Sequence, residues 1–237
     1  MSTRRVVMLI ADIGGYTEYM QFHRSILGHA EAATTRMLAT VVDAARDFDL
    51  IEIEGDAAFL SREANALDDG AAVATITQAA VAMHRAFHAE RRMVQLNMCP
   101  CGSCTQTSDL KLKFVAHVGE VATQTIKRRR KLVGTDVIFV HRLLKNSVDV
   151  PEYVLLSEDL HRDDAVPAFP IREISQELEG FGRVRTYVVA VEDLAATVPS
   201  VPDPSWPRRI GATVGILGRG ARYALRPRRP RRPASLP

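Results

Sequence analysis

The chain reads VMLIADIGGYT at residues 7–17, a short apolar run that ends at Asp12 and then turns at two glycines. A second stretch, LIEIEGDAAFL at residues 50–60, places Asp56 in a similar position. Apolar runs of four to eight residues bounded by turn residues are typical of buried strands. If the two strands are neighbours, both carboxylates emerge at the same end of one sheet.

A pair of carboxylates at one sheet end suits a hard divalent cation. Mg²⁺ and Mn²⁺ prefer oxygen ligands, and such ions can hold a nucleoside triphosphate in place. Asp is also common in turns and at caps, so each residue alone has a purely structural interpretation. The pair together favours the metal interpretation, with Asp12, Ile13 and Asp56 as the expected metal site.

Several stretches resemble the class III nucleotidyl cyclases. DIGGYTEY at 12–19 resembles the metal-binding D-I-x-G-F-T stretch of that family, and EIEGDAAFL at 52–60 resembles its G-D-x hairpin. The 44 residues between the two Asp also match the family's spacing. LKFVAHVGEV at 112–121 is similar to the strand before the dimer arm, and LVGTDVIFVHRLLKN at 132–146 to a variant of the G-D-x-V-N-x-A-x-R segment. The resemblance covers roughly residues 5–192 and is greatest to an uncharacterised bacterial family of cyclase-like proteins.

The order of elements predicts an α+β fold. Strands are expected at 5–12, 48–53, 57–61, 110–121, 153–157, 171–178 and 184–191, and helices at 17–46 (divided near Gly28), 70–92 and 135–146. A Cys-rich loop is expected at 98–108 and a solvated basic run at Lys127–Lys131. This order is not a strict βα alternation, which suggests a sheet with helices on one face. The resemblance implies the same ferredoxin-like sheet of the class III cyclase type, with helices packed on it.

The chain divides into a cyclase-like domain at 1–193, a Pro-rich linker at 194–207 and an Arg-rich tail at 208–237. The net charge is +3, but the tail holds nine Arg and no acid, so the remainder has 22 basic and 28 acidic residues. The tail is expected to be disordered and solubilising. Anionic lipid and nucleic acid are alternative partners for it. A membrane-surface helix around 209–225 is opposed by four glycines.

Bulk composition is that of an ordinary soluble globule, with 46% hydrophobic and 25% charged residues. No stretch reaches the ~18 apolar residues of a membrane span. The N-terminus leads directly into the first strand without a signal-peptide region. We therefore expect a cytoplasmic protein, peripheral at a membrane only through the tail.

The resemblance also implies substrate-binding residues. Glu52 aligns with the base-selecting position, where a carboxylate favours guanine; its alternative role is an outward strand residue paired with a cation. Lys131 aligns with the second base-contacting position, although Lys is unusual there. The turn Gly14, Gly15, Tyr16 and Thr17 opens a helix and suits phosphate.

The catalytic half of the implied site departs from the family. Arg142 aligns with the transition-state Arg and is the expected catalytic residue. Ile138 stands where the family has a transition-state Asn, and Thr135 where it has Asp, although Asp136 is adjacent. Activity is therefore expected to be weak, altered or absent. A homodimeric, nucleotide-binding cyclase domain and a non-catalytic nucleotide sensor or scaffold both remain open.

Three cysteines form a second candidate metal site. Cys99, Cys101 and Cys104 lie within six residues and can converge on Zn²⁺. The expected fourth ligand is His88, with His84 and His117 as alternatives. Reduced, non-liganding cysteines and a redox pair are the alternative interpretations of the cluster. A zinc-stapled interaction module with a basic tail is the third hypothesis for the chain.

Overall fold

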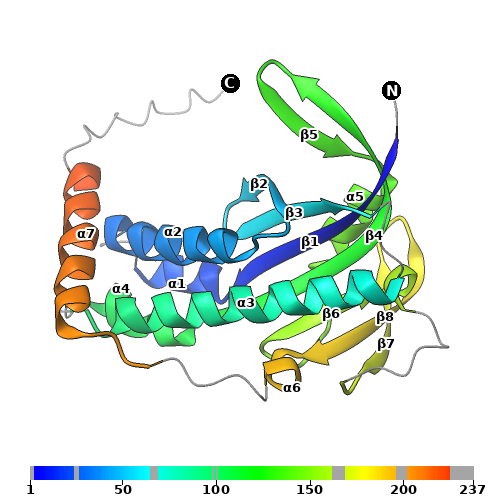
Figure 1. Cartoon of the computed structure of the whole chain (residues 1–237). Helices are drawn as coiled ribbons and strands as arrows, with labels where there is room; N and C mark the ends of the chain where they lie inside the picture. Colours follow the sequence, from blue (N-terminus) through cyan, green and yellow to red (C-terminus); the bar gives the residue numbers. More distant parts are fainter. Residues whose placement is uncertain are drawn as a thin grey trace, which may run out of the picture.

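A computed structural model describes residues 3–23, 27–64, 69–97, 99, 101–161, 169–195 and 202–224. Within these residues the strands form an eight-stranded sheet in the order β2-β3-β1-β4-β6-β8-β7, with β5 paired to β4 (Figure 1). Neighbouring strands are antiparallel except β4 and β6. The predicted α+β class is confirmed.

The element bounds lie close to those predicted from the sequence. The strands are β1 (Arg4–Gly14), β2 (Asp49–Glu54), β3 (Ala57–Glu63), β4 (Lys111–Ile126), β5 (Arg129–Val133), β6 (Tyr153–Ser157), β7 (Arg172–Leu178) and β8 (Gly182–Ala190). The helices are α1 (Tyr16–Phe22), α2 (Leu27–Ala44), α3 (Asp69–Gln95), α4 (Gly102–Thr105), α5 (Thr135–Leu143), α6 (Val191–Ala195) and α7 (Trp206–Ala224), with short 3₁₀ helices η2 (Gln106–Asp109) and η3 (Glu158–Leu160). The Cys-rich loop therefore contains two short helical turns.

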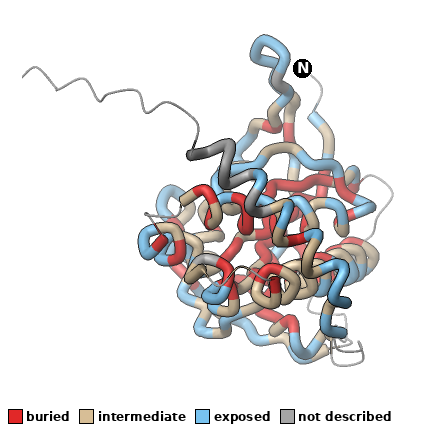
Figure 2. The backbone as a smooth tube through the Cα atoms, turned by 90° about the vertical axis from the view of Figure 1, so that its left-hand side faces the viewer, coloured by how far each residue is buried: buried red, intermediate tan, exposed pale blue. Residues whose placement is uncertain are grey.

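Strand β1 lies inside the sheet and is buried on both faces. Its residues 6–11 are all fully buried. Because side chains alternate across a strand, Val7 and Leu9 join one core while Met8 and Ile10 join the other. Figure 2 shows buried segments of backbone in the interior, enclosed by more exposed segments.

Helices cover both faces of the sheet, which corrects the expectation that they lie on one. Helices α2 and α3 run side by side and bring Met37, Met83 and Phe87 to the first core (Figure 1). Helix α5 packs on the opposite face through Val140 and Leu143. Asp12 is an even-numbered residue of β1 and therefore falls on the α5 face.

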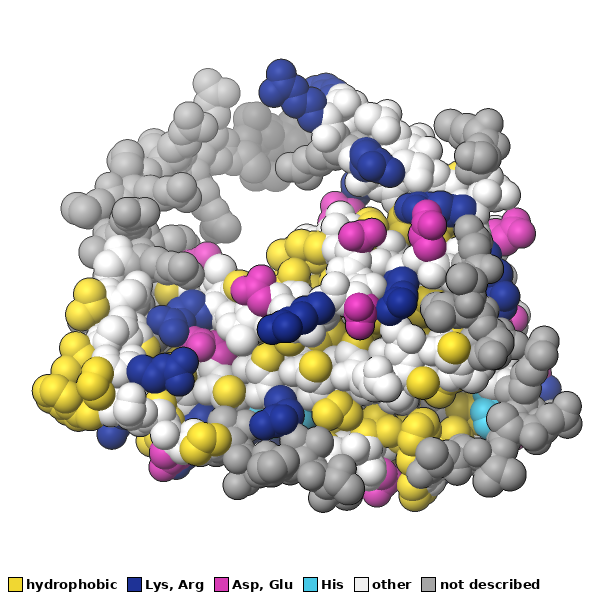
Figure 3. Space-filling view, viewed as in Figure 1, with side chains coloured by type: hydrophobic (Ala, Val, Ile, Leu, Met, Phe, Trp, Pro, Cys, Tyr) yellow, Lys and Arg dark blue, Asp and Glu magenta, His cyan; other side chains and the backbone are white. Residues whose placement is uncertain are grey.

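The ends of β4 and β5 form an arm that projects from the domain (Figure 1). The basic run predicted as a solvated loop is therefore partly strand, since residues 129–133 pair with β4. Lys127 adopts a positive φ of 56° at the turn. Lys127 and Arg128 are exposed there, and basic side chains gather at the arm tip in Figure 3.

Residues 206–224 form helix α7, which corrects the expectation of a linker end and a disordered tail over this range. The Arg209 guanidinium donates to the Leu96 carbonyl at 2.5 Å, and Ala212 is buried. Arg92 on α3 pairs with Asp203 just before the helix. This half of the tail is thus fastened to α2 and α3, while residues 225–237 lie outside the described part. None of the described helices combines the length and apolar character of a membrane span.

Gly119 is predicted to be intolerant of a side chain. A Cβ there would lie 2.2 Å from Asp136 Oδ2 and 2.6 Å from Asp136 Cβ, so α5 would have to shift. Gly119→Ala should lower the free energy of unfolding by about 1–3 kcal/mol, as overpacking does. Gly211→Ala on α7 is the control, because a Cβ there would have no atom within 4 Å. It should raise the free energy of unfolding by up to about 1 kcal/mol, since Ala favours a helix more than Gly does. Urea unfolding measures both, and equal stability of Gly119→Ala and wild type would contradict the packing described.

Candidate functional site

The two acidic residues singled out from the sequence meet at one end of neighbouring strands. In the antiparallel β1–β3 pair Asp12 lies opposite Ala57, and the Ile13 amide donates to the Asp56 carbonyl at 3.2 Å. Burial raises the pKa of the Asp56 carboxyl, and the nearby charge of Asp12 raises it further. The predicted juxtaposition is therefore present, and a bound cation would relieve the repulsion between the two carboxylates.

A lysine that the sequence reasoning missed lies beside this pair. Lys113 on β4 is opposite Asp12 in the sheet, and its Nζ is 3.0 Å from Asp12 Oδ2. Burial disfavours the charged form of Lys113, but Asp12 outweighs burial and raises the pKa of the ammonium. A divalent ion at Asp12 would therefore compete with a resident cation. Only the β1–β4 register reveals this neighbour.

The glycine turn after Asp12 leads into α1. Gly15 has φ of 82°, a left-handed conformation that suits glycine, and its carbonyl accepts from the Tyr19 amide. Burial raises the pKa of the Tyr16 hydroxyl, with Asp56 adding to the effect, so Tyr16 lies near the carboxylate pair. Because α1 has only seven residues, its dipole gives a phosphate limited help.

A cavity of about 690 Å³ on the α5 face collects the other predicted residues. It lies between β2, β5, α5 and the β7–β8 turn, and its lining includes Glu52, Lys131, Ile138 and Arg142. Asp12 and Asp56 do not line it. Within one chain, the carboxylate pair and the expected base- and phosphate-contacting residues therefore occupy separate places.

The cavity's main cations are already paired with acids. Lys131 Nζ lies 2.8 Å from Glu52 Oε2, and the Arg142 guanidinium lies 2.5 Å from Glu179 Oε2. The alternative reading of Glu52, an outward residue paired with a cation, is what this arrangement shows. An anionic ligand would have to displace Glu179, whose side chain is 88% exposed at the β7–β8 turn.

Ile138 lies on α5 at the edge of this cavity. Its side chain is 54% exposed, although it is a large apolar group. It cannot donate or accept a hydrogen bond. The cavity thus offers an apolar side chain where the cyclase resemblance expects a polar one.

The cysteine cluster has a different fourth partner from the predicted one. His29 on α2 meets Cys99, Cys101 and Cys104, and the four ligand atoms all lie within 4.8 Å of one another. His88, the ligand expected from the sequence, is not part of this cluster. Its Nε2 lies 2.8 Å from Glu152 Oε1, so His88 has a structural role. Sequence reasoning missed His29 because it lies 70 residues before the first of these cysteines.

His84 and His88 on α3 form a second cluster with Glu152, which lies just before β6. The cluster therefore joins α3 to the segment before β6. The His84 Nε2 is 3.1 Å from Glu152 Oε2, and the Leu112 amide donates to Glu152 Oε1 at 2.9 Å. Burial opposes the charge on Glu152, but hydrogen bonds from both histidines outweigh it and hold the pKa of the carboxyl well below its usual range. These bonds explain the cluster without a metal.

His117, the remaining alternative zinc ligand, lies on β4 away from the cysteines. Its Nδ1 is 2.8 Å from Ser157 Oγ, and the ring lies near Asp136 and Asp159. It is buried, with 4% of its surface exposed. The structure therefore gives His117 a structural setting.

Comparison with known proteins places the chain in a family. The family model described as "Protein of unknown function (DUF2652)" matches residues 34–153. The uncharacterized protein Rv2561/Rv2562 of Mycobacterium tuberculosis is 36% identical over 176 residues, which cover 72% of this chain and 79% of that protein. The chain belongs to the DUF2652 family.

Solved structures similar to this DUF2652 chain are cyclase domains. The guanylate cyclase domain of RhGC from Catenaria anguillulae, in complex with GTP, aligns with a TM-score of 0.57 and 16% identity over 80% of this chain and 98% of that one. An adenylate cyclase of Trypanosoma brucei aligns with a TM-score of 0.53 and 13% identity over 85% and 92%. At these identities the similarity shows the fold alone, and it confirms the expected cyclase-type architecture.

Releasing Arg142 should strengthen anion binding in the cavity. Glu179→Gln removes the partner charge, and exposed pairs are worth about 0.2–1 kcal/mol, so affinity for inorganic triphosphate should rise by up to about fivefold. Glu177→Gln, in the same cavity lining, is the matched control and should change affinity less. Titration calorimetry measures both. Weaker binding by Glu179→Gln than by wild type would contradict the proposed competition.

The burial of His117 predicts a stability change with pH. Burial lowers the pKa of the imidazole despite the opposing charges of Asp159 and Asp136. As pH falls through about 6.5, the unfolded chain binds a proton that the folded chain does not, so stability present at higher pH is lost. His117→Asn should show a shallower decline in urea-unfolding free energy between roughly pH 7.5 and 5.5, the range around that pKa. Equal slopes for the two proteins would show that His117 does not contribute.

Proposed function

We propose that this chain is a class III cyclase-like domain that binds a divalent metal ion and a nucleoside triphosphate. The observation that carries the proposal is the meeting of Asp12 and Asp56 at the end of β1 and β3 in a cyclase-type fold. Their carboxylates would hold Mg²⁺ or Mn²⁺, and Ile13 on β1 would contribute only its backbone carbonyl, because its side chain is apolar and buried. Such an ion supplies charge neutralisation for the phosphates.

The separation of the two residue groups supports a homodimer. The cavity with Glu52, Lys131 and Arg142 does not include the carboxylate pair of its own chain. Both groups lie on the α5 side, so a second copy packed against this face would bring one chain's cavity to the other chain's carboxylates. Symmetric dimers form such isologous contacts. The exposed Ile138 at the cavity edge is an apolar surface that this contact would cover.

Binding without turnover is the second candidate, and Ile138 favours it. Loss of one oriented polar group commonly costs about 10²–10³ in rate. Lys113 on Asp12 and Glu179 on Arg142 also weigh against an efficient site. On this reading the domain senses a nucleotide or acts as a scaffold.

The carboxylates should be required for metal-dependent nucleotide binding. Asp12→Asn and Asp56→Asn should each abolish Mn²⁺-dependent binding, because each removes an anionic oxygen ligand. The wild-type chain is incubated with each of the four ribonucleoside triphosphates and Mn²⁺, and products are separated by mass. A cyclic monophosphate lost in Asp56→Asn identifies an enzyme and names the base. Saturable binding without product favours the sensor, and Mn²⁺-dependent binding that survives either substitution rejects the metal site.

Mixed variants test the shared site if product forms. Asp12→Asn and Arg142→Ala should each be inactive alone. Random mixing should restore roughly a quarter of the wild-type rate, because half of the dimers are mixed and each keeps one intact site. No recovery after verified subunit exchange would place the whole site within one chain.

A further inference from the structure

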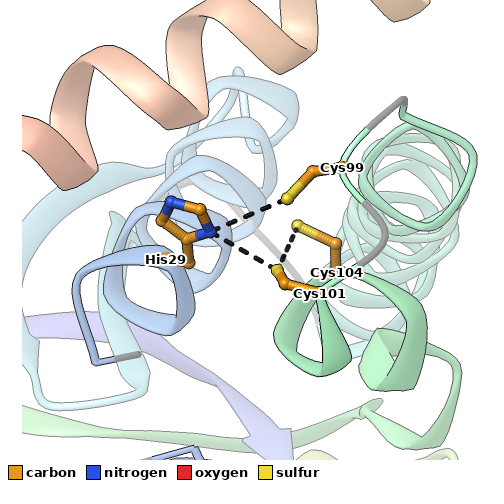
Figure 4. Close-up of side chains that lie close together, drawn as sticks. All are labelled: His29, Cys99, Cys101 and Cys104. Atoms are coloured by element: carbon orange, nitrogen blue, oxygen red, sulfur yellow. Dashed lines mark hydrogen bonds between the residues drawn. The ribbon is translucent and has the colours of Figure 1, made fainter. Parts of the chain in front are cut away.

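Four soft ligand atoms converge at the start of α2. His29 comes from the first turn of α2, Cys99 from the segment after α3, Cys101 from the residue before α4, and Cys104 from α4 itself (Figure 4). His29 Nδ1 lies 3.4 Å from Cys101 Sγ and 3.8 Å from Cys99 Sγ. Cys101 Sγ lies 3.4 Å from Cys104 Sγ. In Figure 4 these side chains point toward a common centre.

These separations suit a tetrahedral zinc site. With Zn–S near 2.3 Å and Zn–N near 2.0 Å, tetrahedral geometry sets neighbouring ligand atoms roughly 3.5–3.8 Å apart. Three of the six pairs of ligand atoms lie 3.4–3.8 Å apart, and all six lie within 4.8 Å. The cysteines are free thiols, and the Cys101–Cys104 separation far exceeds the roughly 2.05 Å of a disulfide.

The donor set also selects the class of metal. One imidazole and three sulfurs form a soft site without carboxylate, which favours Zn²⁺ over Mg²⁺, Ca²⁺ or Mn²⁺. Four protein ligands fill a tetrahedron, as in closed structural sites, and leave no position for substrate. The cluster thus differs in chemistry from the oxygen donors at Asp12 and Asp56.

We infer that His29, Cys99, Cys101 and Cys104 form a structural Zn²⁺ site. The ion joins the start of α2 to the connection between α3 and β4, two segments about 70 residues apart in the chain. Zinc binding of this type contributes directly to folding free energy. The inference stands independently of nucleotide binding.

The connection between α3 and β4, which holds the three cysteines, also packs against the glycine turn beside Asp12. A Cβ on Gly102 would lie 3.2 Å from the His23 ring at the end of α1, so the two segments touch. A Cβ on Gly15 would lie 3.6 Å from the Asp109 carbonyl at the end of η2. The connection therefore contacts both ends of α1. Loss of zinc should loosen α1 as well as the start of α2.

Metal analysis of the purified full-length chain tests the site. Elemental analysis should find about one Zn²⁺ per chain, as a single Cys₃His site requires. Cys101→Ser and His29→Gln should weaken zinc binding by more than the roughly 10–100-fold typical of changes outside the ligand shell. His88→Gln, which alters the ligand first expected from the sequence, and Asp56→Asn should keep the metal. Hydrogen exchange should increase in α1 and at the start of α2 when zinc is removed.

Replacing zinc by cobalt in the wild-type protein tests the site even if the cysteine variants fail to fold. Wild-type protein stripped of metal and titrated with Co²⁺ should show thiolate charge-transfer bands and the visible spectrum of a tetrahedral ion, both removed by added Zn²⁺. Absence of zinc together with absence of a cobalt spectrum would overturn the site. So would a Cys101–Cys104 disulfide in freshly isolated protein, or loss of zinc in His88→Gln with retention in His29→Gln. Loss of zinc in Asp56→Asn would also contradict two separate metal sites.

Discussion

Strand β1 is covered on both faces, and the remaining structure depends on that burial. Its residues 6–11 have no exposed surface, and alternate side chains enter two different cores. A strand of this kind must pair on both edges, and β3 and β4 supply those partners. The same pairing brings Asp56 and Lys113 beside Asp12. The position of the acidic pair therefore follows directly from the packing of the core.

Charge compensation determines what the candidate site can do within one chain. Lys113 neutralises Asp12, Glu52 neutralises Lys131, and Glu179 neutralises Arg142. Each pair is partly exposed, so solvent screens it and a competing ligand can replace either partner. In the homodimer that we propose, a second copy of the chain supplies the opposing half of the site. In this arrangement, the ion pairs within one chain are replaced by pairs with the bound ligand or with the second chain when the dimer assembles and the ligand binds.

The histidines illustrate how similar residues acquire different roles. His88 and His84 hold Glu152 through direct hydrogen bonds, and His117 is buried beside Ser157. His29 alone of the described histidines joins the cysteine sulfurs. Its partners come from a segment that also contacts α1, so the cluster and the glycine turn belong to one packed region.

Local sequence patterns were enough to predict most of the strands and the two acidic turns. Alternation and apolar runs located the strands, and the placement of Asp12 and Asp56 after two such runs indicated that they would meet, because strand ends at one sheet edge are neighbours. The partners of the site residues are set by contacts between distant parts of the chain. Strand register places Lys113 beside Asp12, and the β7–β8 turn places Glu179 beside Arg142. Helix packing places His29 beside the three cysteines. The folded structure also shows that α5 covers the second face and that residues 206–224 form a helix, which packs against α2 and α3 and is held by the bond from Arg209 to the Leu96 carbonyl. Contacts between residues far apart in the chain leave no periodic signal in the sequence, which is why only the folded structure reveals them.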